Sequence, residues 1–117
     1  MAWNVDFHPD FRVEHESLPR YVQVALGRRI LALREQGPAL GRPYADTLRA
    51  SRHPNMKELR LKTAVGAWRV AFAFDPERQA ILLVAGNKER EKERRFYTRF
   101  ISEADARFDG HLARLGE

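Results

Sequence analysis

The stretch Met56–Gly86 constrains the fold more than any other part of the chain, because its apolar residues follow the period of β-strands. Apolar and charged residues alternate in Leu59–Lys62, and large apolar residues alternate with small or charged ones in Ala67–Phe74. A period of two is typical of strands with one buried face. Ala80–Gly86 is apolar throughout, as expected for a strand buried on both faces. Turn residues separate these segments, so the sequence predicts a three-stranded antiparallel meander over roughly 58–86.

The two faces of this meander differ in character. One face is expected to form the core under the N-terminal helices and carries Trp68, Val70, Phe72 and Phe74. The other face carries Arg60, Lys62 and Arg69 beside Ala71 and Ala73. The small alanines predict a shallow cationic surface with room for a bulky anion.

Helices are predicted before the meander. Alternation in residues 3–7 indicates a short first strand, and Pro9, capped by His8, suits the first position of a helix. Pro19 ends that helix, and Gly37-Pro38 ends the next one. The second helix carries the apolar stripe Val22, Leu26, Ile30 and Leu33. The two helices are expected to form a hairpin laid across the sheet.

The remaining segments are predicted with less regular patterns. Residues 39–55 lack periodicity, and Tyr44 and Leu48 are expected to anchor this connection to the core. Charges of alternating sign after Gly86 favour an exposed helical segment. Ser102 and Asp105 resemble a capping box that begins a final amphipathic helix. The predicted order is β-α-α-β-β-β-α, an α+β fold with one helical layer and a single domain over residues 1–117.

Composition restricts the class of function. The chain has 117 residues, a net charge of +5 and a sequence pI of about 10.1, which favours an anionic partner such as nucleic acid. It has no cysteine, no signal-peptide pattern and no apolar run of membrane-spanning length, so a cytoplasmic protein without membrane contact is expected. Its histidines have no ligand spacing, so neither a metal nor a cofactor is expected; they are His8, His15, His53 and His111.

The cations of the meander can be interpreted in two ways. They can be an ordinary solvated strand face, with Tyr97 simply packed against the protein. They can also form a phosphate site, because Arg presents a planar fork of donors to phosphate oxygens and several cations would stabilise the charge that develops on in-line attack. Lys88 and Arg90 follow the third strand and would join this site. A Lys or Tyr crowded by other cations would have a lowered pKa and could act as a base. Lys57 is expected just before the strand rather than on the cationic face.

Several sequence segments carry a resemblance to a known family. They run in order as LGRPYADTL (Leu40–Leu48), MKELR (Met56–Arg60), WRVAFAFD (Trp68–Asp75), QAILLVAGNK (Gln79–Lys88) and RFYTRFI (Arg95–Ile101). Together they resemble HigB-type toxins of the phage-derived branch of the RelE/ParE superfamily. The resemblance implies two N-terminal helices packed on a twisted antiparallel sheet, with a C-terminal helix.

The resemblance also implies a function. RelE-like toxins enter the A site of the 70S ribosome and cut mRNA there, by attack of the RNA 2′-OH on the adjacent phosphate. The positions that match the family's basic and tyrosine residues are Arg60, Lys62, Arg69, Lys88 and Tyr97. Lys62 or Tyr97 would be the base, Arg69 would hold the phosphate, and Lys88 or Arg90 would assist the leaving oxygen. RNA-binding roles are expected for Lys57, Arg90, Arg49 and Arg52. The segment from Gly86 to Tyr97 is longer than in RelE, so the choice between Lys88 and Arg90 stays open.

Two alternatives and a partner follow from the same resemblance. In the ParE branch this fold poisons DNA gyrase without cutting RNA, but that branch lacks the full basic set. A third possibility is an inactive RNA-binding member. A toxin of this kind implies a cognate helix-turn-helix antitoxin as its partner.

Overall fold

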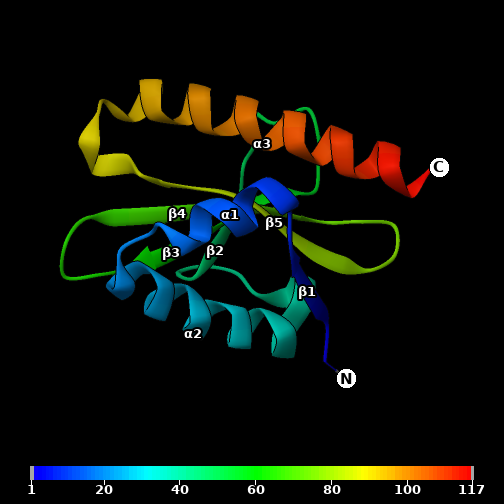
Figure 1. Ribbon diagram of the computed structural model, residues 1–117, viewed down its shortest axis with the longest axis horizontal. Coiled ribbons are helices and arrows are strands. Elements are labelled where there is room, and N and C mark those ends of the chain that lie inside the picture. The colour runs from blue at the N-terminus through cyan, green and yellow to red at the C-terminus, as the bar shows by residue number, and fades with distance from the viewer. Residues whose placement is uncertain (1, 117) are drawn as a thin grey trace.

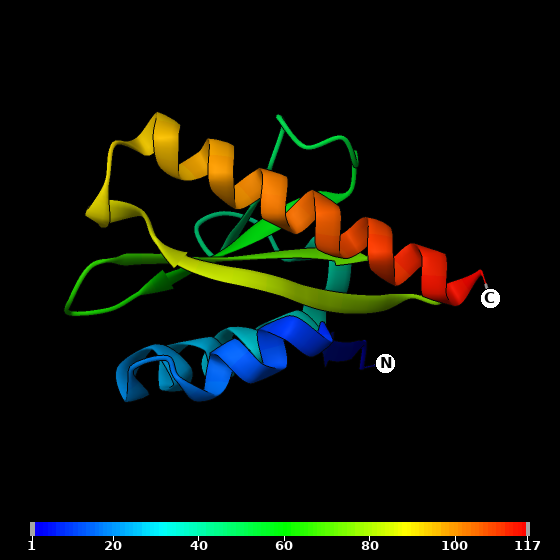
Figure 2. The ribbon, with the colours of Figure 1, turned by 45° about the horizontal axis from the view of Figure 1, so that its top comes forward.

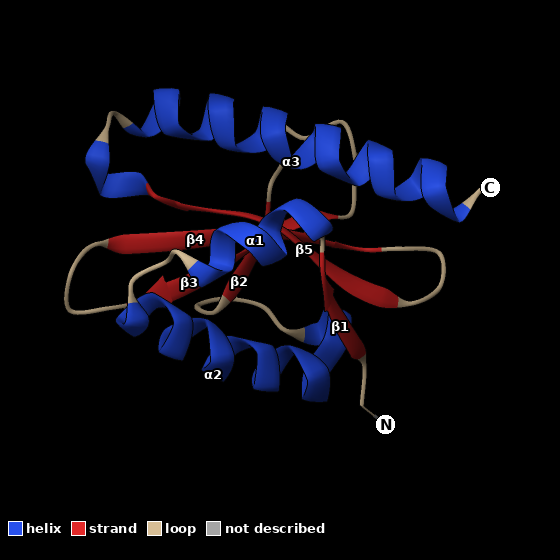
Figure 3. Cartoon of the chain, in the orientation of Figure 1, coloured by secondary structure: helices blue, strands red, loops and turns tan. Residues whose placement is uncertain are grey.

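The computed structural model describes residues 2–116, which form an α+β fold with a five-stranded sheet. The elements in chain order are β1 (Asn4–Phe7), α1 (Pro9–Glu16), α2 (Arg20–Gln36), the short 3-10 helix η1 (Gly37–Ala39), β2 (Ala45–Thr47), β3 (Met56–Lys62), β4 (Ala67–Phe74), β5 (Gln79–Asn87), the 3-10 helix η2 (Lys88–Arg90) and α3 (Glu93–Leu115). Figure 3 shows the helices and strands in separate colours. None of the helices between residues 2 and 116 combines the length and apolar character needed to cross a bilayer.

The sheet confirms the predicted meander and adds an edge strand on each side of it. Strands β3, β4 and β5 pair antiparallel as expected, and the strand order is β1-β5-β4-β3-β2. However, β1 pairs parallel with β5, so the sheet is mixed and not wholly antiparallel. Alternation predicts which residues are buried but not the direction of a strand, which depends on the return path through α1 and α2. The three-residue edge strand β2 lies in the connection that lacked periodicity.

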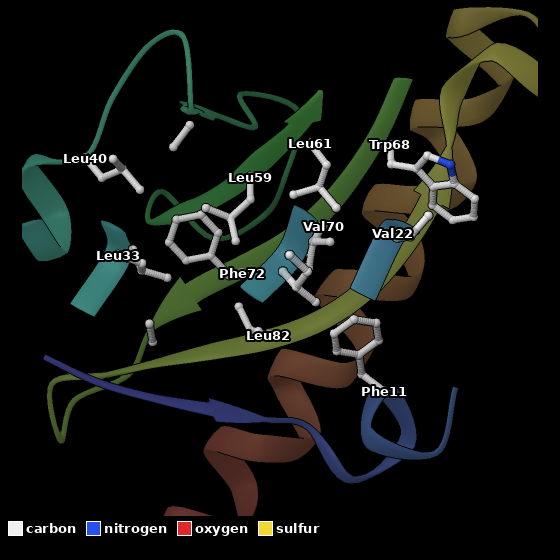
Figure 4. Close-up of a cluster of buried hydrophobic side chains, with 13 residues drawn as sticks. Phe11, Val22, Leu33, Leu40, Leu59, Leu61, Trp68, Val70, Phe72 and Leu82 are labelled. Carbon is white, nitrogen blue, oxygen red and sulfur yellow. The ribbon is translucent and has the colours of Figure 1, made fainter. Parts of the chain in front are cut away.

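Helices α1 and α2 cover one face of the sheet and bury the predicted apolar residues (Figure 1). Phe11 of α1 and Val22 of α2 lie against this face, where Val70 and Phe72 are fully buried (Figure 4). His8 caps α1 as expected, because its Nδ1 accepts a hydrogen bond from the Asp10 N–H at 3.1 Å. The apolar stripe of α2 therefore determines which face of the meander becomes this half of the core.

Helix α3 covers the opposite face, so the fold has two helical layers rather than one (Figures 1 and 2). Ala71 and Ala73 are fully buried beneath it and do not form an open surface. Gly86 has a similar role, since a Cβ at this position would lie 2.7 Å from the Phe96 ring. Small residues in the sheet thus make room for the aromatic side chains of α3, and only the part of the cationic face beyond the helix stays open.

The start of α3 also differs from the prediction. One continuous helix runs from Glu93 to Leu115, so Ser102 and Asp105 lie inside it and do not form a capping box. Asp105 instead accepts hydrogen bonds from Ser51 Oγ at 2.5 Å and from the Arg52 N–H at 3.1 Å. Asp105 therefore makes a tertiary contact instead of a helix cap, and this contact joins the connection before β3 to α3.

Arg107 joins α3 to the other helical layer. Its guanidinium donates to the Leu83 carbonyl at 2.7 Å and to Glu14 Oε1 of α1 at 2.8 Å. Glu103 accepts a further bond at 2.9 Å. The neighbouring carboxylates raise the pKa of Arg107, with the Glu14 hydrogen bond as the main cause. This contact stabilises the position of α3 relative to β5 and α1.

The two expected anchors of the connection behave differently. Leu48 is 5% exposed and lies in the core beneath α3, as predicted. Tyr44 is 43% exposed, so its assignment as a core anchor was wrong. It directly precedes the edge strand β2, and Arg29 stacks on its ring, with Cζ 4.4 Å from the ring centroid.

Candidate functional site

The hairpin of β3 and β4 brings the predicted cations together. Arg60 pairs directly with Arg69 across the two strands, and Lys62 pairs with Ala67 near the turn. Two like charges placed opposite each other on neighbouring strands destabilise a sheet unless another group compensates them. The register therefore requires a negative group close to the two guanidinium groups.

Glu58 supplies that negative charge. It lies on the same face of β3, two residues before Arg60, and is only 3% exposed. Its carboxylate accepts hydrogen bonds from Tyr97 Oη at 2.8 Å and from Arg60 Nε at 3.3 Å. Arg69 Nε lies 3.8 Å from the same carboxylate. A buried carboxylate is stable only when it is paired and hydrogen-bonded, so these four residues form one unit.

Sequence reasoning missed Glu58, although a signal was present. Glu58, Arg60 and Lys62 alternate in one strand, so an acid at the first of these positions shares the cationic face. Its burial could not be predicted, because it depends on α3 lying over the start of β3.

A second carboxylate holds Arg60 from the edge of the sheet. Asp46 Oδ2 lies 3.2 Å from Arg60 Nη2 and 2.7 Å from Arg42 Nη2. The hydrogen bond from Arg42 is the main cause that lowers the pKa of Asp46 below its ordinary value. Arg69 has a different environment: its Nη1 donates to the Trp68 carbonyl at 3.0 Å, and its buried Nε lacks a hydrogen-bond partner among residues 2–116. Both guanidinium groups are therefore held in fixed positions.

A hollow of about 570 Å³ opens beside these residues. Its lining residues come mostly from the end of β3, the β3–β4 turn and the start of β4. This turn projects at the end of the molecule where α3 begins (Figure 1). Four cationic side chains line the hollow, those of Arg29, Arg60, Lys62 and Arg69, together with Tyr44 and Glu89. We call this the cationic hollow. It is the part of the predicted cationic face that remains accessible to an anion.

Lys62 and Arg69 differ in accessibility within the cationic hollow. Lys62 is exposed, and no carboxylate between residues 2 and 116 pairs with it. The Arg69 side chain is only 12% exposed, so the prediction that it lies on a solvent face was wrong. The Lys62 side chain can therefore move to contact a ligand, whereas only a small part of the Arg69 side chain is accessible to one.

Tyr97 reaches the unit from α3 but is not activated as a base. Burial and the hydrogen bond to Glu58 raise the pKa of Tyr97 to about 12, and Arg69 opposes this shift only in part. The expectation that surrounding cations lower its pKa was wrong, because the group that contacts its hydroxyl is an anion. At neutral pH the phenol stays protonated and donates to Glu58.

The pKa of Tyr97 predicts how stability depends on pH. A pKa of about 12 in the folded protein, against 10.0 ordinarily, means that the unfolded state loses this proton first as the pH rises. The stabilisation is therefore complete below about pH 10 and decreases between pH 10 and 12. Tyr97→Phe should remove this pH dependence, so the difference in unfolding free energy between the two proteins should narrow across that range. Urea unfolding from pH 8 to 12 measures this, and an unchanged difference would contradict the raised pKa of Tyr97.

Lys88 and Arg90 lie in η2 next to the cationic hollow but do not line it. Lys88 Nζ pairs with Glu93 Oε1 at 3.2 Å, and Arg90 is exposed. The residue of η2 that lines the cationic hollow is Glu89. The local turn geometry thus places an acid where the sequence predicted a cation, and the assignment of Lys88 or Arg90 to the leaving oxygen stays a prediction.

The other basic residues lie away from the cationic hollow. Lys57 is inside β3 and not before it, and it faces the opposite side, with Nζ 3.2 Å from the Pro38 carbonyl oxygen. Arg52 pairs with Asp109 of α3, and Arg49 is exposed in the same connection. Their RNA-binding roles stay predictions. Within residues 2–116, no three His, Asp or Glu side chains form a cluster that could hold a metal ion.

Comparisons with known proteins identify relatives of the chain. The sequence model of the family described as phage-derived protein Gp49-like matches residues 14–109. The candidate toxin HigB2 of Mycobacterium tuberculosis is 51% identical over 87 residues, which cover 74% of this chain and 43% of HigB2. The candidate toxin HigB3 of the same organism is 42% identical over 97 residues, covering 83% of this chain and 82% of HigB3. The chain therefore spans less than half of the length of HigB2 but most of that of HigB3.

A solved structure has a similar fold. A doubly substituted form of the E. coli toxin RelE, in the free state, matches with a TM-score of 0.62 and covers 92% of this chain and 98% of its own. The two sequences are 20% identical, so the likeness concerns the fold. It agrees with the predicted α+β fold.

Proposed function

The chain belongs to the phage-derived Gp49-like family, and we propose that it is the toxin of a type II toxin–antitoxin pair that cuts translated mRNA. The observation that carries this proposal is the cationic hollow, where Arg60, Lys62 and Arg69 converge beside a buried carboxylate. The names of the two mycobacterial relatives and the RelE-like fold support it. Cations held in this way suit a phosphodiester better than a neutral substrate.

The proposed reaction is attack of an RNA 2′-OH on the adjacent phosphate. The oxygen of the 2′-OH forms a bond to phosphorus while the bond from phosphorus to the 5′-oxygen of the next nucleotide breaks. The proton of the 2′-OH goes to a base, and the leaving 5′-oxygen takes a proton from Lys88 or from solvent. The reaction requires the 2′-OH and therefore cannot act on DNA. Arg60 and Arg69 would bind the phosphate oxygens and stabilise the charge that develops on them. In this scheme the protein contributes positioning and charge, and a bound metal is not required.

Glu58 would act as a positioning residue in this scheme. It contacts Arg60, Arg69 and Tyr97 but is too buried to meet the substrate. Its carboxylate would hold the two guanidinium groups in orientation before the RNA arrives. Preorganised donors of this kind need no rearrangement during the reaction, which makes them effective in catalysis.

Of the two bases suggested by the sequence, the geometry favours Lys62. The Tyr97 hydroxyl donates to Glu58 and loses its proton only near pH 12. Lys62 is exposed in the cationic hollow without a paired carboxylate among the described residues. Lys62 is thus the proposed base, while Tyr97 would hold Glu58 in place.

Mapping RNA ends in induced cells tests the function directly. The protein is expressed in a bacterium together with a translated copy and an untranslatable copy of one mRNA, and new 5′ ends are sequenced. We expect ends only in the translated copy, because the proposed reaction takes place in the ribosomal A site. Cleavage on purified 70S ribosomes should persist in EDTA once ribosome integrity is maintained with polyamines. Growth arrest with intact mRNA and damaged DNA would instead support the gyrase-directed alternative.

The proposed partner is a cognate helix-turn-helix antitoxin encoded by a neighbouring reading frame. A cationic site that cuts cellular RNA has to be inhibited until it is needed, and an acidic surface would complement it. Co-expression with the neighbouring frame should restore growth and yield a co-purifying complex in the cytoplasm. A protein that is harmless alone and has no neutralising neighbour would contradict the toxin assignment.

A further inference from the structure

Tyr44 lies at the rim of the cationic hollow with an unusual neighbour. It is 43% exposed, and an isolated exposed aromatic residue would need no explanation. However, the guanidinium of Arg29 lies over its ring, with Cζ 4.4 Å from the centroid. Arg29 is itself fixed, because its Nε donates to the Arg60 carbonyl at 3.0 Å. A cation and an aromatic ring are therefore stacked in a defined position next to the cations of β3.

The backbone connects this stack to the proposed phosphate site. The Arg60 N–H donates to the Tyr44 carbonyl at 2.8 Å, so Tyr44 and Arg60 are neighbours across the edge of the sheet. Arg29 in turn donates to the backbone carbonyl of Arg60. Tyr44 and Arg29 line the same cavity as Lys62 and Arg69. The cationic hollow is thus lined by an aromatic ring as well as by cations.

We propose that Tyr44 and Arg29 form a stacking platform for the RNA base adjacent to the phosphate that Arg60, Lys62 and Arg69 bind. This inference rests on the proposed function, and it assigns one nucleotide of the substrate to two residues outside the proposed catalytic set. A nucleotide combines an anionic phosphate with a flat aromatic base, which matches a hollow lined by both cations and an aromatic ring. Its volume of about 570 Å³ lies within the ordinary range of small-ligand sites, roughly 300–1000 Å³.

The chemistry of the platform favours stacking over base-edge recognition. Both Tyr rings and Arg guanidinium planes stack on nucleobases, and single-stranded RNA is commonly bound in this way. Every base has a π-face, so the platform would accept different bases. A purely electrostatic site for an acidic protein segment would need the cations but not the ring of Tyr44. The contribution of the ring therefore distinguishes the two ligands.

Equilibrium binding of short RNA provides the test. The probe is a single-stranded 2′-O-methyl RNA, which lacks the attacking hydroxyl and stays intact, titrated up to millimolar concentration and followed by NMR chemical shifts. Tyr44→Ala should weaken binding about 5- to 150-fold, the range found when one stacked base loses its aromatic partner. Tyr44→Phe, which keeps the ring, should stay within about twofold of the parent. Circular dichroism confirms that each variant is folded.

A matched control and an altered probe isolate the stacking contribution. Tyr21 is 41% exposed on α2 and does not line the cationic hollow, so Tyr21→Ala should leave RNA binding unchanged. An RNA series with one abasic position at a time should contain one position where the base matters. At that position the effect of Tyr44→Ala should vanish, because the two changes remove the same contact.

The possible outcomes separate this inference from the proposed function. Binding that depends on Tyr44 and on one base, without mRNA cleavage in cells, supports the platform and contradicts the nuclease proposal. Cleavage that persists in Tyr44→Ala, together with equal binding of intact and abasic RNA, overturns the platform and leaves the nuclease proposal standing. Displacement of the RNA by an acidic peptide, with no dependence on any base, would identify a plain anion site and overturn the platform. An absence of RNA binding up to millimolar concentration would also overturn the platform.

Discussion

Lys62→Ala should lower the rate of mRNA cleavage about 100- to 10,000-fold, which is the usual contribution of a side chain that acts as general base. Lys62 lies at the exposed end of β3 within the cationic hollow, and no carboxylate of residues 2–116 is left unpaired by its removal. Stability should therefore change by no more than about 0.5 kcal/mol. Single-turnover cleavage on 70S ribosomes and thermal unfolding measure the two quantities separately.

Lys62 is a better target than Arg69 for this experiment. Removing the guanidinium of Arg69, whose Nε lies 3.8 Å from Glu58, would leave a buried carboxylate with fewer cations around it. Loss of activity in Arg69→Ala would then combine a catalytic effect with a structural one.

Arg114→Ala is the matched control for charge. Arg114 is an exposed cation in the last turn of α3, at the end of the helix away from η2, so its removal changes the net charge equally. It should retain cleavage and growth arrest. Full toxicity of Lys62→Ala, or an equal loss in both variants, would contradict a specific role for Lys62.

Trp68→Ala should destabilise the protein by about 3–5 kcal/mol, the typical cost of truncating a large aromatic residue in a core. Trp68 is 9% exposed in β4 and belongs to the core cluster that includes Val22 and Val70 (Figure 4). A domain is commonly stable by only about 5–15 kcal/mol, so this variant would be close to unfolding at growth temperature. Urea unfolding followed by circular dichroism measures the change.

Trp68→Phe provides a sharper comparison at the same position. The indole Nε1 of Trp68 is buried without a hydrogen-bond partner among the described residues. Phenylalanine would keep an aromatic ring in the core and remove that unsatisfied donor, whose burial costs roughly 1–3 kcal/mol. The Phe variant should therefore lose much less stability than the Ala variant. As a control, Val65→Ala should hardly change the unfolding free energy, because Val65 lies in the β3–β4 turn and is 60% exposed. Equal losses in the two Trp68 variants would contradict a net benefit from removing the unsatisfied indole nitrogen.

Strong local periodicity was enough to predict several elements of the fold. The alternation in β4 predicted which side chains enter the core, and burial of Val70 and Phe72 confirms it. The stripe of α2 and the signals at His8 and Gly37 predicted the helix boundaries, because caps and glycines with positive φ act within a few residues. The placement of Arg60 and Arg69 on one face was also predicted, and their pairing across β3 and β4 agrees with it.

Local patterns did not predict how these elements cover one another. The direction of β1 and the position of α3 depend on packing between segments far apart in the chain, and no local pattern encodes them. That packing buries Tyr97 and places its hydroxyl against Glu58. Both effects raise the pKa of Tyr97, which the sequence had suggested as one of two possible bases. The same packing also closes the alanine surface and leaves the cationic hollow beside Tyr44. Local periodicity specifies the face on which a side chain lies, whereas burial and charge environment depend on what packs against that face.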